Sequence, residues 1–328
     1  MSAPGKSCDV LVVGEYFCDL IFAGLQDVPR PGAEFYATGL TMRPGGCYNM
    51  AVALVRLGIA TEWACDFGTD LFSRAVLAQA GRDGIGSAGF TVLDHDLQRV
   101  SAAFTHGTER GFISFSEAPV TPPDPALLDR LRPDWLLQSF RFEPDWLAFL
   151  RHARTGGARI FGDCRHGEFS LATRGVRDFL ACCDVFSPNE AEALALTGAP
   201  NLDTAIDRLA DLTPVVVVKR GASGARANNR GERLDAAAPP VAVVDTIGAG
   251  DAFNAGYLAG VLWGRGVADC LALAVACGAL STTGPGSSAV PDAATLTAFA
   301  DASGRLTPAT EAALAGLRFQ RTTKGELT

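Results

Sequence analysis

The sequence predicts an α/β fold whose central sheet is mainly parallel and is covered by helices. Short apolar runs alternate with helix-type segments along most of the 328 residues, which is typical of strand–helix–strand units. Several runs lead directly into glycine or acidic residues, as where Val10–Val13 precedes Gly14 and Glu15. Hydrophobic residues make up 48% of the chain and charged residues 20%, so the chain can bury a large core.

The apolar runs predict the strands and their order. They lie at Cys8–Gly14, Thr61–Phe67, Trp135–Gln138, Ala158–Phe161, Val185–Phe186, Val215–Val218 and Val241–Val244. Helix-type segments lie between them, at Asn49–Gly58, Leu71–Ala80, Pro144–Arg154, Glu190–Leu196 and Asp203–Leu212, and a helix rich in small residues follows Gly250. Glycines at positions 58 and 81 end the first two helices, and the residues before Glu190 are a typical helix start.

Two stretches break this alternation. Residues 21–41 contain two prolines and several glycines, and residues 99–115 alternate like exposed antiparallel strands with a turn near Gly107. Two interpretations remain open for them, a small β-layer away from the main core and ordinary surface loops. If the two stretches form a β-layer, the core comprises residues 8–20, 42–98 and 116–318. The polar residues 319–328 are expected to be a flexible tail.

Composition excludes several classes of function. A net charge of −8 argues against nucleic-acid binding through a general basic surface. No apolar run is long enough to cross a membrane. The nine cysteines form no C-x-x-C pair, which favours a reducing cytoplasm over disulfides or a zinc site. Only Lys6, Lys219 and Lys324 are lysines, so a Gly-Lys-Ser/Thr phosphate loop is absent.

The most informative segment runs from Asp245 to Gly256 and reads Asp-Thr-Ile-Gly-Ala-Gly-Asp-Ala-Phe-Asn-Ala-Gly. Gly248, Ala249 and Gly250 can direct successive backbone N–H groups at one anion, most simply a phosphate, at a helix N-terminus. Asp251 follows at once. It can cap the helix, or it can take a proton from a hydroxyl that attacks the phosphate.

This segment resembles the second signature of the ribokinase (PfkB) family of sugar and nucleoside kinases. The resemblance implies a ribokinase-like three-layer sandwich with a small β-sheet lid, built from the two stretches that break the alternation. It also implies that Asp251 is the catalytic base and that Gly248–Gly250 form the anion hole.

Residues near the N-terminus are candidates for substrate binding. Asp19 matches a family aspartate that binds sugar hydroxyls, and Gly45, Gly46 and Asn49 resemble the first family signature. Glycines allow a ligand to approach the backbone, and an amide can donate and accept hydrogen bonds. The alternatives are a surface turn for Asp19 and a helix cap for Asn49. The insert before Asn49 departs from ribokinases, which weakens an assignment of ribose.

Further motifs follow later strands. Asp163 and Arg165 loosely resemble a family segment near the substrate, and a surface Asp–Arg pair is the alternative. Asn189 and Glu192 match the family's Asn-x-x-Glu motif, which implies that they organise Mg²⁺ through its waters. A helix start is the alternative for this pair.

The resemblance also implies the nucleotide site. Gly221 and Gly224 would let the backbone lie against the nucleotide, and Lys219 either reaches the phosphates or caps the end of the sheet. The backbone of Asp245 and Ile247, with the loop at residues 282–286, would bind a monovalent cation such as K⁺.

Together these features predict an ATP-dependent kinase that uses Mg²⁺ and phosphorylates a hydroxyl of a sugar or sugar derivative. A nucleoside kinase is the first alternative, because Phe17, Tyr36 and Tyr48 could stack a base. A vitamin kinase of the same superfamily and a catalytically silent sugar-binding protein on this fold are the others. Exposed apolar edges around Phe35 and Phe112–Phe115 predict a homodimer through the lid.

Overall fold

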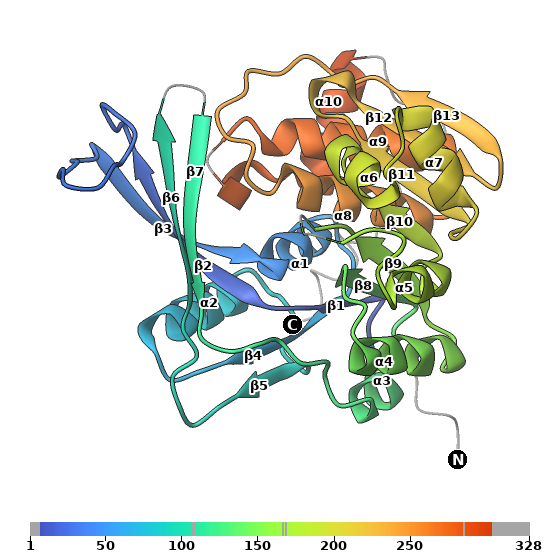
Figure 1. The fold of residues 1–328 in the computed structure, drawn as a ribbon, viewed down its shortest axis with the longest axis horizontal. Coiled ribbons are helices and arrows are strands. Elements are labelled where there is room, and N and C mark those ends of the chain that lie inside the picture. Colours follow the sequence, from blue (N-terminus) through green and yellow to red (C-terminus); the bar gives the residue numbers. More distant parts are fainter. Residues whose placement is uncertain (1–6, 107–108, 166, 168, 285, 304–328) are drawn as a thin grey trace, which may run out of the picture.

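The computed structural model describes residues 7–106, 109–165, 167, 169–284 and 286–303 (Figure 1). A 9-stranded sheet forms the centre, with the strand order β13-β12-β11-β10-β9-β8-β1-β4-β5. Its strands are β1 (Val10–Val13), β4 (Thr61–Phe67), β5 (Phe90–Val92), β8 (Trp135–Ser139), β9 (Arg159–Asp163), β10 (Val185–Ser187), β11 (Val215–Lys219), β12 (Ala225–Asn229) and β13 (Glu232–Ala236). All neighbouring strands pair in parallel except the pairs β11–β12 and β12–β13, which are antiparallel.

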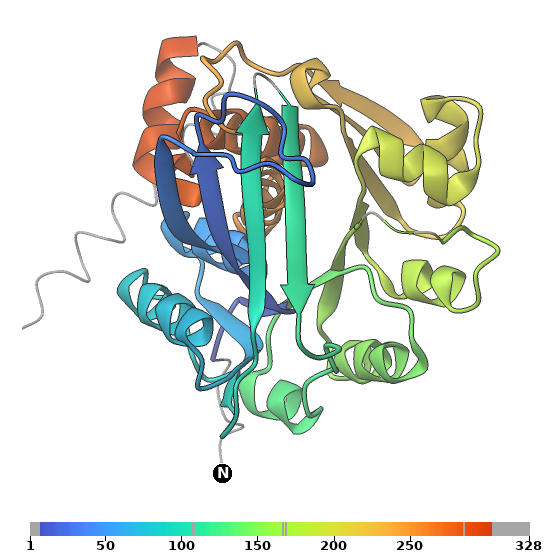
Figure 2. The same cartoon turned by 60° about the vertical axis from the view of Figure 1, so that its left-hand side comes forward.

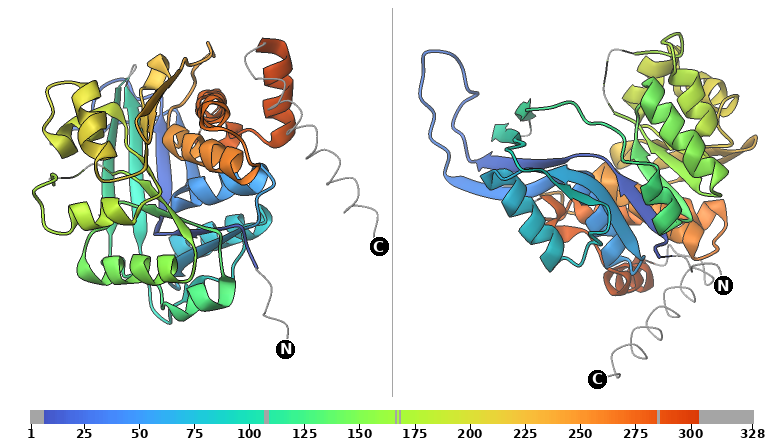
Figure 3. Two further views of the ribbon diagram at one scale, coloured as in Figure 1. Left: turned by 90° about the vertical axis from the view of Figure 1, so that its right-hand side faces the viewer. Right: turned by 90° about the horizontal axis from the view of Figure 1, so that it is seen from below.

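Helices cover both faces of this sheet (Figure 3). One face carries α1 (Cys47–Arg56), α2 (Leu71–Arg82), α8 (Ala249–Leu262) and α9 (Val267–Ser281); the other carries α3 (Ala126–Leu131), α4 (Pro144–Thr155), α5 (Val176–Cys182), α6 (Glu190–Thr197) and α7 (Leu202–Ala210); α10 (Ala293–Ser303) follows. Successive residues of a strand point to opposite faces. In β1, Val10 and Val12 therefore join one buried cluster while Leu11 and Val13 join the other. None of the described helices is both long and apolar enough to cross a membrane.

A second sheet projects from the core (Figures 1 and 2). Its strands are β2 (Tyr16–Ala23), β3 (Gly39–Gly46), β6 (Arg99–His106) and β7 (Glu109–Ser116), in the order β3-β2-β6-β7. Within the first stretch that breaks the alternation, residues 21–23 and 39–41 are strand and residues 24–38 form none. Pro29 and Pro31 lie in this stretch, and proline cannot donate a ladder hydrogen bond. Residues 107 and 108, where the hairpin turn is expected, lie outside the described residues.

The apolar run Val241–Val244 is not the predicted strand. In the described part of the chain, this run pairs with no strand, and Val243 and Val244 are 62% and 64% exposed. The Val244 N–H donates instead to the carbonyl of Thr282, at 2.8 Å. Val241 and Val243 line a cleft described below, so these apolar side chains belong to the wall of the cleft and not to the core.

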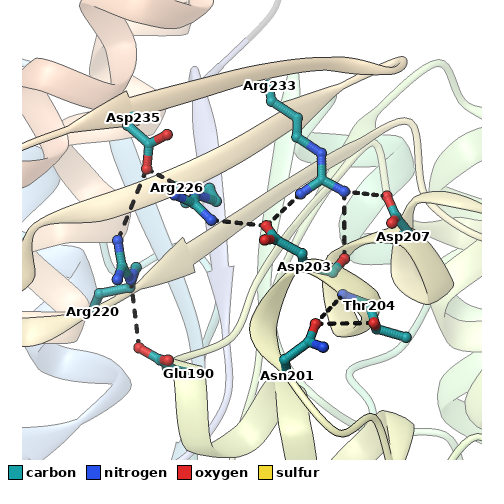
Figure 4. Close-up of polar contacts among 9 residues, drawn as sticks. All are labelled: Glu190, Asn201, Asp203, Thr204, Asp207, Arg220, Arg226, Arg233 and Asp235. Atoms are coloured by element: carbon teal, nitrogen blue, oxygen red, sulfur yellow. Dashed lines mark hydrogen bonds and ion pairs between the residues drawn. The ribbon is translucent and has the colours of Figure 1, made fainter.

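An ion-pair network joins the antiparallel hairpin β12–β13 to α7 (Figure 4). Asp203 pairs with Arg226 at 2.8 Å and with Arg233 at 2.6 Å, and Arg226 also pairs with Asp235 at 2.8 Å. Exposed pairs each contribute little to stability, but a network holds its members in one geometry. The charges on β13 also make this edge strand a poor template for further pairing.

Candidate active site

The turn before α8 presents free backbone donors at the carboxyl end of the sheet. Gly248 has φ 76, a left-handed conformation that favours glycine. The Ala249 N–H donates to the Thr246 carbonyl at 3.3 Å, so it is partly engaged. Within the described part of the chain, the N–H groups of Gly250 and Asp251 have no hydrogen-bond acceptor. A helix N-terminus with such unpaired donors suits an anion.

Asp251 lies in the first turn of α8, where it is half-buried and does not cap the helix. Burial raises the pKa of Asp251 to about 7 and the charge of Asp163 adds to the rise, while Lys219 and the neighbouring Asn49 side chain oppose it. A carboxylate with a pKa near neutrality can accept a proton from a substrate.

Asp19 lies on β2 and its side chain covers Gly45. A Cβ atom at Gly45 would lie 2.2 Å from Oδ2 of Asp19, so only glycine leaves room for that carboxylate. Burial raises the pKa of Asp19 to about 6, and Asp245 adds to the rise. Asp19 also acts on the pKa of Asp251. Asp19 and Asp251, which are far apart in the sequence, therefore lie near each other at one site.

Asn49 lies inside α1, whose N-cap is Gly46, so the helix-cap alternative for Asn49 is wrong. Its side chain is 5% exposed and contacts the turn before α8: a Cβ at Gly248 would lie 3.5 Å from Nδ2 of Asn49. Gly46 has φ 64, and a Cβ there would lie 2.6 Å from the carbonyl oxygen of Glu15. The glycine pair thus allows the close crossing of β2, β3 and α1.

The turn at Asp245 is joined to the loop at residues 282–286. Oδ1 of Asp245 accepts from the N–H of Ile247 at 2.9 Å, and Oδ2 accepts from the N–H of Gly286 at 2.7 Å. The Asp245 N–H donates to the carbonyl of Thr282 at 3.0 Å. The two segments named for a monovalent cation are therefore adjacent.

Asn189 and Glu192 form a capping box at the start of α6. Oδ1 of Asn189 accepts from the N–H of Glu192, and Oε2 of Glu192 accepts from the N–H of Asn189, both at 2.8 Å. The helix-start alternative is therefore present in the structure. The carboxylate also acts on the neighbouring amine of Lys219, so it lies beside the site.

Asp163 and Lys219 meet each other. Nζ of Lys219 lies 2.8 Å from Oδ1 of Asp163, and Nδ2 of Asn254 donates to the same oxygen at 2.6 Å. Ser187 donates to Oδ1 of Asn254 at 2.8 Å. Sequence reasoning missed Ser187 and Asn254, although Asn254 lies one helical turn after Asp251 and so shares its face.

Arg165 does not join this cluster. Its Nε donates to the carbonyl of Phe140 at 2.9 Å. Within the described ranges it forms no ion pair with Asp163, so the surface Asp–Arg alternative is wrong.

A largely apolar cleft of about 580 Å³ adjoins the turn before α8. Its wall includes Lys219, Gly221, Gly224 and Gly250, with Val241, Val243 and Phe253 among the apolar residues. Gly224 has φ 83, and a Cβ there would lie 1.9 Å from the carbonyl of Ala236. Clefts of this size and character bind cofactor-sized molecules, and this one opens onto the free N–H groups of α8.

Comparisons with known proteins agree with this arrangement. The family model described as pfkB family carbohydrate kinase matches residues 8–294. A fructokinase of Klebsiella pneumoniae is 41% identical over 146 residues, which are 40% of this chain and 47% of that protein. The match thus spans less than half of that relative. A deoxyribokinase of Salmonella typhi is 27% identical over 294 residues, covering 85% of this chain and 94% of the relative.

Solved structures show the same fold. Arabidopsis thaliana ribokinase, complexed with ribose and ATP, superposes with a TM-score of 0.78 at 20% identity, covering 90% of this chain and 99% of that chain. A putative ribokinase II from E. coli, in complex with ATP and Mg²⁺, gives a TM-score of 0.76 at 21% identity, covering 90% and 99%. The predicted ribokinase-like α/β fold, with a mainly parallel sheet and a smaller separate sheet, is confirmed.

Proposed function

Because the chain belongs to the pfkB family of carbohydrate kinases, we propose that it transfers the γ-phosphate of ATP to a hydroxyl of a sugar or sugar derivative. One observation carries this proposal. Asp251, with its pKa raised to about 7, lies directly beside the unpaired N–H groups at the start of α8. A base and an anion site in contact are what phosphoryl transfer to a hydroxyl requires.

In this mechanism the apolar cleft holds the nucleotide, with Gly221 and Gly224 against it. The N–H groups of Gly248 and Gly250 donate hydrogen bonds that stabilise the negative charge on the transferring phosphoryl group. Asp251 takes the proton from the attacking hydroxyl as the new P–O bond forms and the bond to ADP breaks. The second sheet acts as the lid over the acceptor.

Asp19, Gly45, Gly46 and Asn49 would hold the other hydroxyls of the acceptor. Asp19 offers two oxygens and, within the part of the chain that the structure describes, has no hydrogen-bond partner of its own. Arg165, two residues after β9, stays a predicted acceptor ligand, although its Nε donates to the Phe140 carbonyl.

The donor set fits magnesium held through water. The capping box uses one lone pair on each side chain of Asn189 and Glu192, and amide and carboxylate oxygens carry more than one. When bound, Mg²⁺ neutralises charge on the ATP phosphates. The contacts of Asp245 with Ile247, Gly286 and Thr282 support a monovalent cation site between these two loops.

A panel assay tests the proposal. Sugars, sugar acids, sugar phosphates and nucleosides are supplied with MgATP, and ADP release is coupled to NADH oxidation. We expect turnover with at least one sugar or sugar derivative. Faster turnover of nucleosides would favour the nucleoside alternative, and nucleotide binding without turnover of any acceptor would favour the silent binding protein.

The structure weakens one basis of the nucleoside alternative. Tyr48 is 2% exposed, its hydroxyl donates to Asp83, and its ring packs edge-on against Trp63. A side chain in that position cannot stack a base. The names of the two relatives reported above, fructokinase and deoxyribokinase, also support a sugar.

The raised pKa of Asp251 predicts a pH profile. The base must be ionised, so kcat/KM is expected to fall about tenfold per pH unit below about pH 7 and to level off above it. Initial rates across the range, with MgATP saturating, measure this limb. A profile that stays flat to pH 5 would contradict Asp251 as the base.

Glu192→Gln is expected to raise the Mg²⁺ concentration for half-maximal rate by about tenfold, because a charge that orients the metal's waters is lost. The amide still accepts the capping hydrogen bond, so the helix start is kept. Glu190→Gln, two residues earlier, changes a partly exposed carboxylate that pairs with Arg220 at 3.5 Å, and is the matched control. An unchanged Mg²⁺ titration of the Glu192 variant would leave that residue as a helix cap alone.

We propose that two copies join through the outer face of the lid. Met42 and Ile113 are 47% and 69% exposed. They share one row across the sheet with Leu20 and Ala102, whereas Asp19 points to the opposite face. We expect a dimer by light scattering at micromolar concentration, converted to monomer by Ile113→Asp. Val92→Asp, at an exposed site on β5, is the control, and a wild-type monomer would contradict the assignment.

A further inference from the structure

Beside Asp251 lies a cluster of polar side chains from separate elements. Asp163 ends β9, Lys219 ends β11, Ser187 ends β10 and Asn254 belongs to α8. Lys219 and Asp163 are each only 14% exposed in their side chains. Nζ of Lys219 also lies 3.4 Å from Oδ1 of Asn254, so one amine bridges the strand ends and the helix.

We propose that Asp163, Lys219 and Asn254 act as one positioning unit for Asp251, and not as separate ligands of the sugar and the nucleotide. The inference rests on the proposed kinase function and assigns these residues within it. The unit holds the first turn of α8 against the ends of β9 and β11. It thereby keeps Asp251 and the anion site in a fixed position relative to each other.

Geometry carries the proposal. Asn254 follows Asp251 by one turn of α8, so the two share a helix face. The amine of Lys219 lies against the anion site, because a Cβ at Gly250 would be 3.7 Å from Nζ. Both contacts of that amine, to Asp163 and to Asn254, come from this cluster. Removing either charge alone leaves the other half-buried without its partner.

The two charges also act on the base with opposite signs. Asp163 raises the pKa of Asp251 and Lys219 lowers it. The other groups that face Asp251 are Asp19 from β2, which raises its pKa, and Asn49 from α1, which lowers it; Glu192 from α6 faces Lys219. Interactions between charges are stronger in a half-buried site than in water.

The alternative role for Lys219 is a direct contact with the nucleotide phosphates, since the residue also lines the cleft. The two roles separate kinetically. A phosphate ligand contributes to ATP affinity, so its loss raises the KM for ATP. A positioning residue acts on the chemical step, so its loss lowers kcat. It also shifts the acid limb of the pH profile, which is the pH range where kcat/KM falls as Asp251 becomes protonated.

The experiment compares Asp163→Asn, Lys219→Met and the double variant. We expect each single variant to lose about 10- to 100-fold in kcat with the KM for ATP changed less than about threefold. The acid limb of kcat/KM should move to lower pH in Asp163→Asn and to higher pH in Lys219→Met. In the double variant the limb should return toward the wild-type position.

Arg226→Met is the matched control, because it removes the two ion pairs that Arg226, on the neighbouring strand β12, forms with the exposed Asp203 and Asp235 (Figure 4). Its kinetics should equal wild type. A large rise in the KM for ATP with an unmoved limb in Lys219→Met would overturn the proposal in favour of a phosphate contact. If the acid limb moves in the same direction in Asp163→Asn and Lys219→Met, or moves in neither, the Asp163–Lys219 pair is only a structural contact.

Two measurements keep the test independent of folding and of the proposed function. If Lys219→Met does not fold, Lys219→Gln removes the charge while an amide still donates to Asp163, and the same upward shift is expected. If the wild-type protein phosphorylates no acceptor in the panel, the kinase proposal fails. The Asp251 titration is then followed by carboxyl ¹³C NMR in the same variants, where opposite shifts support the unit and equal shifts overturn it.

Discussion

Replacing Asp251 with asparagine is expected to lower kcat by about 10²- to 10⁴-fold while nucleotide binding stays close to wild type. Asparagine keeps the shape of the side chain and its contact with Asn49 but cannot accept the proton of the attacking hydroxyl. The backbone donors of Gly248 and Gly250 are unchanged, so the anion site should still hold the phosphates.

Steady-state rates from the coupled assay measure the loss, and calorimetry with a non-hydrolysable ATP analogue measures the affinity. Asp211→Asn, at an exposed helix end, makes the same chemical change away from the site and should leave both values unaltered. Turnover of the Asp251 variant within a few-fold of wild type would assign the base elsewhere.

Asp19→Ala is expected to lower kcat/KM for the hydroxylated acceptor by about 10- to 100-fold, because a buried hydroxyl that loses its partner costs about 1–3 kcal/mol. The KM for ATP should barely move, since Asp19 lies on the lid strand β2 and not on the nucleotide cleft. Kinetics with one substrate varied at a time separate the two effects.

Asp19→Asn is the companion variant. It retains hydrogen-bonding capacity without the charge, so it should recover part of the loss. If both variants raise the KM values for acceptor and ATP alike, the substitution has disturbed the lid as a whole, and Asp19 is then not a specific contact for the acceptor.

Local pattern was sufficient for most of the central sheet. Thr61–Phe67 is both the predicted run and strand β4, and the strands that end at Asp163 and Lys219 were placed within two residues. These strands are buried over most of both faces, so their sequences are rich in apolar residues and easy to recognise. The same reasoning identified the turn before α8 and, through it, Asp251.

Pattern failed where a residue's role depends on distant partners. The run Val241–Val244 has the composition of a strand, yet its side chains serve the cleft. The hairpin β12–β13 was missed because its strands carry arginines that pair with aspartates of α7. Nothing local to Asp163 or Lys219 shows that they meet, because that contact exists only once β9 and β11 lie in one sheet.

The raised pKa values of Asp19 and Asp251 link catalysis to folding. Both carboxyls bind their proton more tightly in the folded chain, at pKa values of about 6 and about 7, than at the ordinary value of 3.8. The folded state therefore gains stability from them at low pH and loses it progressively as the pH rises through 6 and 7. The protein without substrate is therefore less stable at the pH where Asp251, the proposed base, is ionised. In the proposed reaction, substrates that hydrogen-bond to those carboxylates would restore this stability through mass action.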